Sequence, residues 1–173
     1  FHIPCNARAI KQDLQKYAAK RPGICRLRLL MDSCGKTSFE HAALVIPDNS
    51  SRRIAVSPLR TDSHDLFLRH KTTLRDLYNA EYKKYKAQGY FDVIFCNEKD
   101  EITEGAISNI FFEKNGRLYT PPLSCGLLNG IGRELMMKKR QVKEKILYIS
   151  DLKKADRIYL TNSVRGVNEV FWE

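Results

Sequence analysis

The strongest constraint on the fold of this chain is an Asn-Gly dipeptide, Asn115-Gly116, which stands between two apolar runs. Residues 106–114 and 117–120 flank it, and Asn-Gly favours the tight two-residue turn of a β-hairpin. Pro121-Pro122 then ends the second run, because proline cannot donate a hydrogen bond to a β-ladder. The sequence therefore predicts an antiparallel hairpin over residues 106–120.

Hydrophobic periodicity predicts helices and strands along the rest of the chain, in an order typical of an α+β fold. Helical spacing covers residues 7–20, 72–89 and 131–139, and a short helix is expected at 151–155. Strand-like patterns cover residues 24–31, 38–46, 52–57, 91–96, 144–149, 156–161 and 168–172. Pro22-Gly23 stops the first helix, and the turn residues 47–51 join two strands.

This order predicts two lobes. A small α+β lobe covers residues 1–60, a linker without clear periodicity covers residues 61–70, and a larger lobe covers residues 71–173. A chain of 173 residues suffices for one ordinary domain or two small ones. No apolar run approaches the ~20 residues that a membrane-spanning helix needs.

Composition limits the class of function. The five cysteines are odd in number and include no CxxC pair, which predicts reduced thiols in a cytoplasmic protein, with no metal site. The net charge is +10, and a basic chain can bind nucleic acid. However, the basic residues are spread along the chain, and no zinc finger or aromatic RNA-binding motif accompanies them. We therefore favour a solvated basic surface, which also suits a small anionic substrate.

Two polar motifs, around Lys71 and around Glu104, contain side chains that could take part in catalysis. Lys71 directly follows the predicted linker beside an arginine and a histidine, so it is either a solvated charge or an amine activated for imine formation. Glu104-Gly105 precedes Ser108-Asn109, and the apolar run 110–112 follows at once. A strand needs neither this carboxylate nor the Ser-Asn pair, so the motif indicates a site at the start of a buried strand.

Two further loops could meet a ligand. Gly130 and Gly132 flank Ile131 at the start of a predicted helix, where backbone amides attract phosphate. The segment LTNSVRG, residues 160–166, offers hydroxyl and amide groups at the end of a strand. A plain glycine turn and an ordinary polar turn are the respective alternatives when each loop is taken alone.

Taken in order, these four segments resemble the fold-type IV pyridoxal-phosphate enzymes, the class IV aminotransferase family. Lys71 in HKTT and the NSVRG segment are most similar to the aminodeoxychorismate lyase branch. The resemblance is strong over residues 70–172 and loose over residues 1–69. It implies a two-lobed fold like that of D-amino-acid aminotransferase, with pyridoxal 5'-phosphate as cofactor and a homodimer as the assembly.

The resemblance also implies roles for individual residues. Lys71 would carry the cofactor covalently and move a proton at the substrate's α-carbon, and Glu104 would hold the proton on the pyridine nitrogen. The cofactor phosphate would be held at the remaining cofactor-binding positions, namely Ile131, Gly132 and Ser163. The substrate carboxylate would be met by Val164 and Arg165.

Two departures from the family pattern bear on activity. The family's first lobe begins with strands and a phosphate-binding arginine upstream of the position that matches Phe1, which implies a truncated small lobe and weakened cofactor binding. Asp76 stands five residues after the lysine, where many aminotransferases carry a tyrosine. The resemblance therefore implies first a lyase of folate biosynthesis that converts 4-amino-4-deoxychorismate to 4-aminobenzoate and pyruvate. An aminotransferase acting on branched-chain or D-amino acids and an inactive or binding-only domain are the alternatives.

Overall fold

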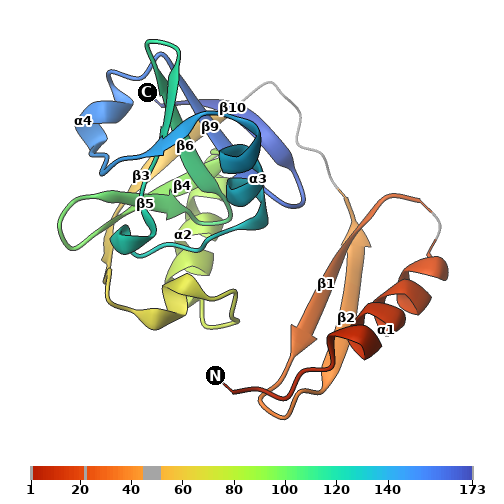
Figure 1. Cartoon of the computed structure of the whole chain (residues 1–173). Helices are drawn as coiled ribbons and strands as arrows, with labels where there is room; N and C mark the ends of the chain where they lie inside the picture. The colour runs from red at the N-terminus through yellow and green to blue at the C-terminus, as the bar shows by residue number, and fades with distance from the viewer. Residues whose placement is uncertain (1, 22, 45–51, 173) are drawn as a thin grey trace. The chain divides into compact units, whose positions relative to one another are not determined.

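The computed structural model describes residues 2–21, 23–44 and 52–172, and the chain divides into two units, Phe1–Pro47 and Asp48–Glu173 (Figure 1). Pro22 and the turn expected at residues 47–51 lie outside the described residues. The sequence pattern assigns residues 52–57 to the small lobe, whereas the structure places them in the second unit, because they pair with the strands of its sheet.

The first unit consists of a helix and a hairpin, in the predicted order. Its elements are α1 (Ala7–Ala19), β1 (Cys25–Met31) and β2 (Thr37–Ala43). Asn6 caps α1 by accepting a hydrogen bond from the Ala9 amide, and β1 and β2 pair in antiparallel fashion. The Tyr17 and Phe39 rings lie 5.2 Å apart and hold the helix against the hairpin. None of the described residues of this unit is fully buried.

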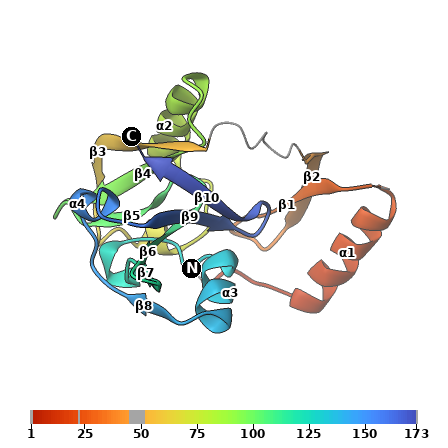
Figure 2. The same ribbon diagram turned by 90° about the horizontal axis from the view of Figure 1, so that it is seen from above.

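The second unit is built on an eight-stranded sheet in the order β5-β4-β3-β10-β9-β6-β7-β8. The strands are β3 (Arg53–Thr61), β4 (Asp92–Asn97), β5 (Ile102–Gly105), β6 (Asn109–Lys114), β7 (Arg117–Thr120), β8 (Val142–Glu144), β9 (Arg157–Asn162) and β10 (Gly166–Trp172). β3 is parallel to β4 and β10, and β7 is parallel to β8. All other neighbours are antiparallel, including β9 and β10, which run side by side in Figures 1 and 2.

The predicted hairpin is confirmed as β6 and β7. Lys114 pairs with Arg117 across a two-residue turn, and both Asn115 and Gly116 have positive φ angles. Asparagine and glycine tolerate that backbone conformation better than other residues, so the dipeptide sets the position of the turn.

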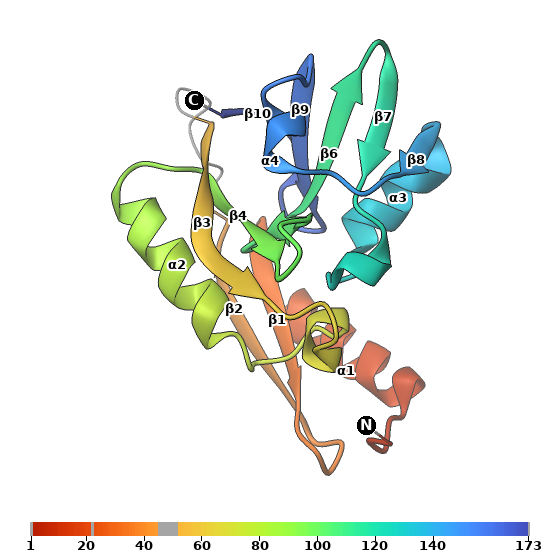
Figure 3. The same ribbon diagram turned by 90° about the vertical axis from the view of Figure 1, so that its left-hand side faces the viewer.

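Helices lie beside this sheet at two places (Figure 3). α2 (Asp76–Ala87) packs against β4, where the Tyr78 and Phe95 rings are 4.5 Å apart, and α3 (Ile131–Lys139) packs against β9. The shorter elements are η1 (Leu66–Arg69), η2 (Leu123–Cys125) and α4 (Ile149–Leu152). Among the described residues, no helix is long and apolar enough to cross a membrane.

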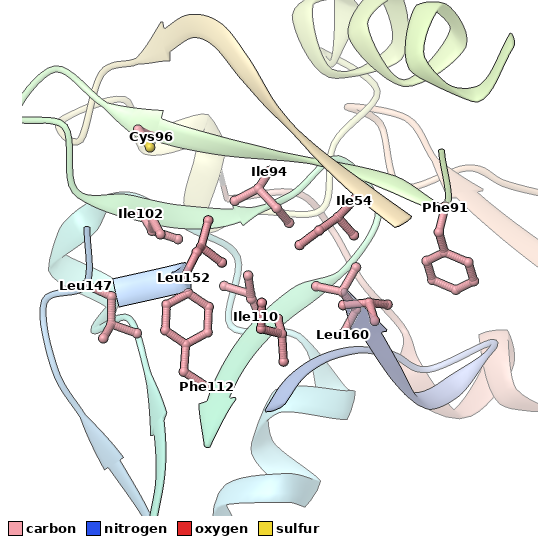
Figure 4. Packing of buried hydrophobic residues seen from close by; sticks show 12 residues of the cluster. Ile54, Phe91, Ile94, Cys96, Ile102, Ile110, Phe112, Leu147, Leu152 and Leu160 are labelled. Carbon is pink, nitrogen blue, oxygen red and sulfur yellow. The ribbon is translucent and has the colours of Figure 1, made fainter. Parts of the chain in front are cut away.

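The core of the second unit lies on β4 and its neighbours. Every residue of β4 is buried, which confirms the prediction of a buried strand over residues 91–96. Ile54, Ile94, Ile110 and Leu160 bring β3, β4, β6 and β9 into one apolar cluster (Figure 4). This core fixes the strand ends that carry the polar motifs.

Three expected elements differ from the structure. The helix expected from residue 72 begins at Asp76, because the preceding residues turn so that the Arg75 side chain reaches the Ala106 carbonyl. The strand expected at residues 144–149 is wrong: β8 ends at Glu144, and the Leu147 carbonyl accepts a hydrogen bond from the Ile102 amide at 2.7 Å. The following helix accordingly begins at Ile149 and not at residue 151.

Candidate active site

Glu104 lies near the end of β5 and is buried, with 5% of its surface exposed. It accepts hydrogen bonds from Asn109 Nδ2 and from the Leu128 amide, both at 3.3 Å and both on Oε2. Burial raises the pKa of its carboxyl from 4.5 to about 8, and the Arg75 and Lys71 cations oppose that rise. The site therefore holds a carboxyl that gains its charge most readily when a further cation comes beside it.

The turn after Glu104 is packed onto a second buried carboxylate, that of Asp92 at the start of β4. Asp92 Oδ2 accepts a hydrogen bond from Ser108 Oγ at 2.7 Å. A Cβ atom on Gly105 would lie only 2.5 Å from the same oxygen, so this position requires glycine. Burial raises the pKa of Asp92 to about 6, although its hydrogen bonds oppose the rise.

Two more side chains hold the same turn from other elements. Arg75, at the start of α2, donates to the Ala106 carbonyl, and Asn162 Nδ2, at the end of β9, donates to the Ile107 carbonyl at 3.1 Å. Side chains from α2, β4 and β9 therefore fix the turn that carries Glu104.

The glycine-rich loop reaches Glu104 through Asn109. Asn109 Nδ2 donates to the Leu128 carbonyl at 2.8 Å as well as to Glu104. A Cβ atom on Gly130 would lie 2.4 Å from Asn109 Oδ1, and one on Gly132 would lie 2.6 Å from Thr161 Oγ1. Since Asn109 and Thr161 are paired across β6 and β9, the first turn of α3 rests on the ends of these two strands.

Lys71 follows η1 and is exposed. Its ammonium group is near enough to Glu104 to lower the pKa of that carboxyl. The structure thus places Lys71 near Glu104, and Glu104 is hydrogen-bonded to the loop that leads into α3, where Ile131 and Gly132 lie.

The segment between β9 and β10 holds the other expected site residues. Ser163 is exposed and follows Asn162, whose Oδ1 accepts hydrogen bonds from the Val164 amide at 3.0 Å and from the Arg165 amide at 2.7 Å. The Arg165 guanidinium lies 5.8 Å from the centre of the Phe91 ring, and its charge lowers the pKa of Asp92. In this conformation, both amides of the turn already have partners.

Sequence reasoning missed three residues of the site, namely Arg75, Tyr78 and Asp92. Arg75 comes four residues after Lys71 and carries no motif of its own. Tyr78 lies on the apolar stripe of a helix, and its hydroxyl is buried close to Glu104. Asp92 gave the one usable signal, because it is a charged residue at the start of a fully buried strand.

The residues present fit pyridoxal phosphate. A buried carboxyl that favours a cationic partner suits a pyridine nitrogen, and the start of a nine-residue helix with two glycines suits a phosphate. A nearby lysine supplies the amine for a covalent link. No group of three or more His, Cys, Asp and Glu side chains in the described ranges is arranged to hold a metal ion.

The α+β fold thus carries a set of side chains and backbone amides that suits pyridoxal phosphate. Residues 1–170 match the family model described as amino-transferase class IV. The chain therefore belongs to the class IV aminotransferase family, whose members are pyridoxal-phosphate-dependent.

Individual relatives fall in two activity groups. The chain is 37% identical over 82 residues to a "Probable branched-chain-amino-acid aminotransferase" of Thermotoga maritima, a match covering 44% of this chain and 30% of that protein. It is 32% identical over 108 residues to a "Putative aminodeoxychorismate lyase" of Schizosaccharomyces pombe, a match covering 57% of this chain and 45% of that protein. Thus the matches span less than half the length of either curated relative.

A solved structure matches nearly the whole chain. A crystal structure of a "Putative amino-acid aminotransferase" from Mesorhizobium loti superposes with a TM-score of 0.91 at 29% identity, over 99% of this chain and 84% of that chain. The expected fold class is thereby confirmed.

Proposed function

We propose that the chain forms the cofactor-binding part of a pyridoxal-phosphate-dependent lyase that converts 4-amino-4-deoxychorismate to 4-aminobenzoate and pyruvate. The observation that carries the cofactor chemistry is the buried Glu104, which has Lys71 beside it and both of its hydrogen bonds on one oxygen. The lyase branch is favoured by the HKTT and NSVRG segments and by Asp76 in place of a tyrosine.

Each site residue has a task in this proposal. Glu104 Oε1, which accepts neither of these two hydrogen bonds, would pair with the ring nitrogen and keep a proton there. The amides of Ile131 and Gly132, with the Ser163 hydroxyl, bind the phosphate at the positive end of α3. Lys71 would hold the cofactor covalently and would take the proton from the substrate carbon that bears the amino group. The bound cofactor supplies an electron sink for that carbon.

The reaction balances without a co-reactant. Removal of the proton by Lys71 is followed by cleavage of the bond between the ring carbon and the oxygen of the pyruvate unit. The ring becomes aromatic, the leaving enolate takes up a proton on carbon to become pyruvate, and no oxidant or keto acid is consumed. Val164 and Arg165 are the proposed contacts for a substrate carboxylate, which requires the Val164 amide to exchange its bond with Asn162.

A class IV aminotransferase acting on branched-chain or D-amino acids is the second candidate. The names of the Thermotoga maritima and Mesorhizobium loti relatives favour it. The two candidates differ in one requirement, because an aminotransferase turns over only when an α-keto acid accepts the amino group, and the lyase needs none.

The test supplies 4-amino-4-deoxychorismate and pyridoxal phosphate to the chain and measures 4-aminobenzoate with and without an added α-keto acid. Product without a keto acid supports the lyase, and turnover of amino acids only with a keto acid supports the aminotransferase. Borohydride reduction followed by peptide mapping should label Lys71 in either case. A chain that binds no cofactor and shows neither activity would support the binding-only alternative.

We also propose that the chain forms a homodimer through the surface around η1 and the start of α2. Phe67, Leu74 and Leu77 are exposed large apolar side chains that line a cavity of about 300 Å³. Sedimentation should give a dimer, and Leu74→Glu should dissociate it. The control is Leu135→Glu on α3, also an exposed leucine, which should leave the dimer intact.

A further inference from the structure

Arg75 occupies an unusual place for a charged residue at a helix start. It is the N-cap of α2, yet its side chain makes no capping bond and turns toward the Glu104 turn, where it donates to the Ala106 carbonyl. On the way, its guanidinium lies 4.8 Å from the centre of the Tyr78 ring. Both contacts hold the guanidinium end of the side chain, and its acceptor, Ala106, lies two residues after Glu104 in the sequence.

Several charged or titratable groups face Glu104. Arg75 and Tyr78 approach from α2, Lys71 precedes that helix, and Asp92 approaches from β4. The two cations lower the pKa of Glu104, and the Arg75 contribution exceeds that of Lys71, whereas Asp92 raises it. Burial and the neighbouring Glu104 raise the pKa of Tyr78 well above its usual value, so that side chain stays neutral.

Arg75 and Lys71 differ in whether they keep their positive charge when pyridoxal phosphate binds. An arginine guanidinium keeps its charge at any pH that the chain meets. Under the proposed function, Lys71 is consumed in the covalent link. Arg75 is then the protein cation that stays beside Glu104.

We propose that Arg75 is a positioning residue that keeps the Glu104 carboxylate ionised and thereby holds the shared proton on the ring nitrogen of the cofactor. The inference rests on the proposed function, because it assigns the ring nitrogen as the partner of Glu104.

Arg75 acts on this proton because of where its charge lies relative to the Glu104 carboxylate and the ring nitrogen. A proton between a carboxyl and a pyridine nitrogen gives either a neutral pair or an ion pair with its negative end on the carboxylate. The Arg75 cation on the carboxylate side stabilises only the ion pair, and burial strengthens that Coulomb effect. The two hydrogen bonds to Oε2 are long at 3.3 Å, so they alone stabilise the charge weakly.

The test measures the protonation of Glu104 in the chain without cofactor. Infrared spectra recorded against pH follow the carbonyl band of the protonated acid, and Glu104→Gln identifies which band belongs to Glu104. Arg75→Gln should raise the midpoint of that titration by about one pH unit, a tenfold rise in proton affinity. Arg75→Lys keeps the charge and should recover most of the shift. Arg117→Gln removes an equal charge from an exposed position on β7 and should leave the midpoint unchanged.

A midpoint that Arg75→Gln leaves in place, or moves no further than Arg117→Gln does, overturns the proposal. If Arg75→Gln does not fold, Arg75→Met also removes the charge, keeps a side chain of similar length, and gives the same test. With pyridoxal phosphate bound, the absorbance of the cofactor against pH should show a less protonated ring in Arg75→Gln. Failure of the proposed function would appear differently, as the absence of borohydride label on Lys71 in the unmodified chain. The infrared titration is done without cofactor, so its result does not depend on that label.

Discussion

The two units of this chain differ in how they use polar side chains. In the first unit, no described residue is fully buried, and the ion pair between Arg28 and Glu40, one of those in this unit, joins two exposed side chains at 3.2 Å. In the second unit, Asp92, Glu104 and Asn109 are buried and hydrogen-bonded beneath an apolar core. An unpaired buried polar group costs about 1–3 kcal/mol, so burial enforces one geometry where exposure permits many. The candidate site therefore lies where packing against the core fixes the positions of its side chains.

The largest effect is expected from Lys71→Ala. Loss of the covalent anchor and of the base should lower turnover by at least about 10²–10⁴-fold. Thermal unfolding should hardly change, because Lys71 is exposed and contributes no core packing. Trp172, the one tryptophan of the chain, lies in β10 and reports unfolding of the second unit by its fluorescence. Activity retained in the Ala variant, with borohydride label on another lysine, would remove Lys71 from its role.

The next largest effect is expected from Glu104→Gln, which should lower turnover about a hundredfold, by analogy with removal of other preorganised electrostatic groups. The variant should also change how stability depends on pH. The folded pKa of Glu104, about 8, lies above its ordinary value of 4.5, so the folded chain binds the extra proton between these limits. The free energy of unfolding therefore falls as pH rises from about 4.5 to 8.

Glu104→Gln should flatten that fall, and Glu113→Gln on β6, a partly exposed glutamate outside the site, should retain it. Unfolding by denaturant, followed through Trp172 at a series of pH values, measures both variants. An unchanged slope in Glu104→Gln would mean that this carboxyl is ionised in the folded chain throughout.

Local patterns predicted much of the second unit, and long-range contacts decided the rest. Asn115-Gly116 set its own turn because the backbone preference is local. By contrast, residues 144–149 contain an apolar run typical of a strand, yet the Leu147 carbonyl accepts a hydrogen bond from the Ile102 amide, forty-five positions away. The four motifs predicted a site, but the Arg75 contact with Ala106 and the Asp92 contact with Ser108 join segments that carry no common signal in the sequence.

A smaller effect is expected from Gly132→Ala, which tests how tightly α3 rests on the strand ends. The new Cβ would meet Thr161 Oγ1 at 2.6 Å, and overpacking of this kind costs about 1–3 kcal/mol. Thr161→Ala in the same chain removes the opposing oxygen, so the double variant should lose less stability than the sum of the two single variants. Additive losses, measured by denaturant unfolding, would show that α3 does not press on Thr161.

The smallest effect is expected in the first unit. Arg28→Ala removes an exposed ion pair and should change stability by less than about 1 kcal/mol, since such pairs are well solvated when broken. Ser108→Ala is the matched change in the second unit, because it also removes one polar partner, but it leaves Asp92 buried without its shortest hydrogen bond and should cost about 1–3 kcal/mol. Circular dichroism follows both units and Trp172 fluorescence follows the second alone, so the two losses can be assigned separately. An Arg28→Ala loss as large as that of Ser108→Ala would mean that the first unit holds its polar groups as firmly as the second, and the contrast between the units would fail.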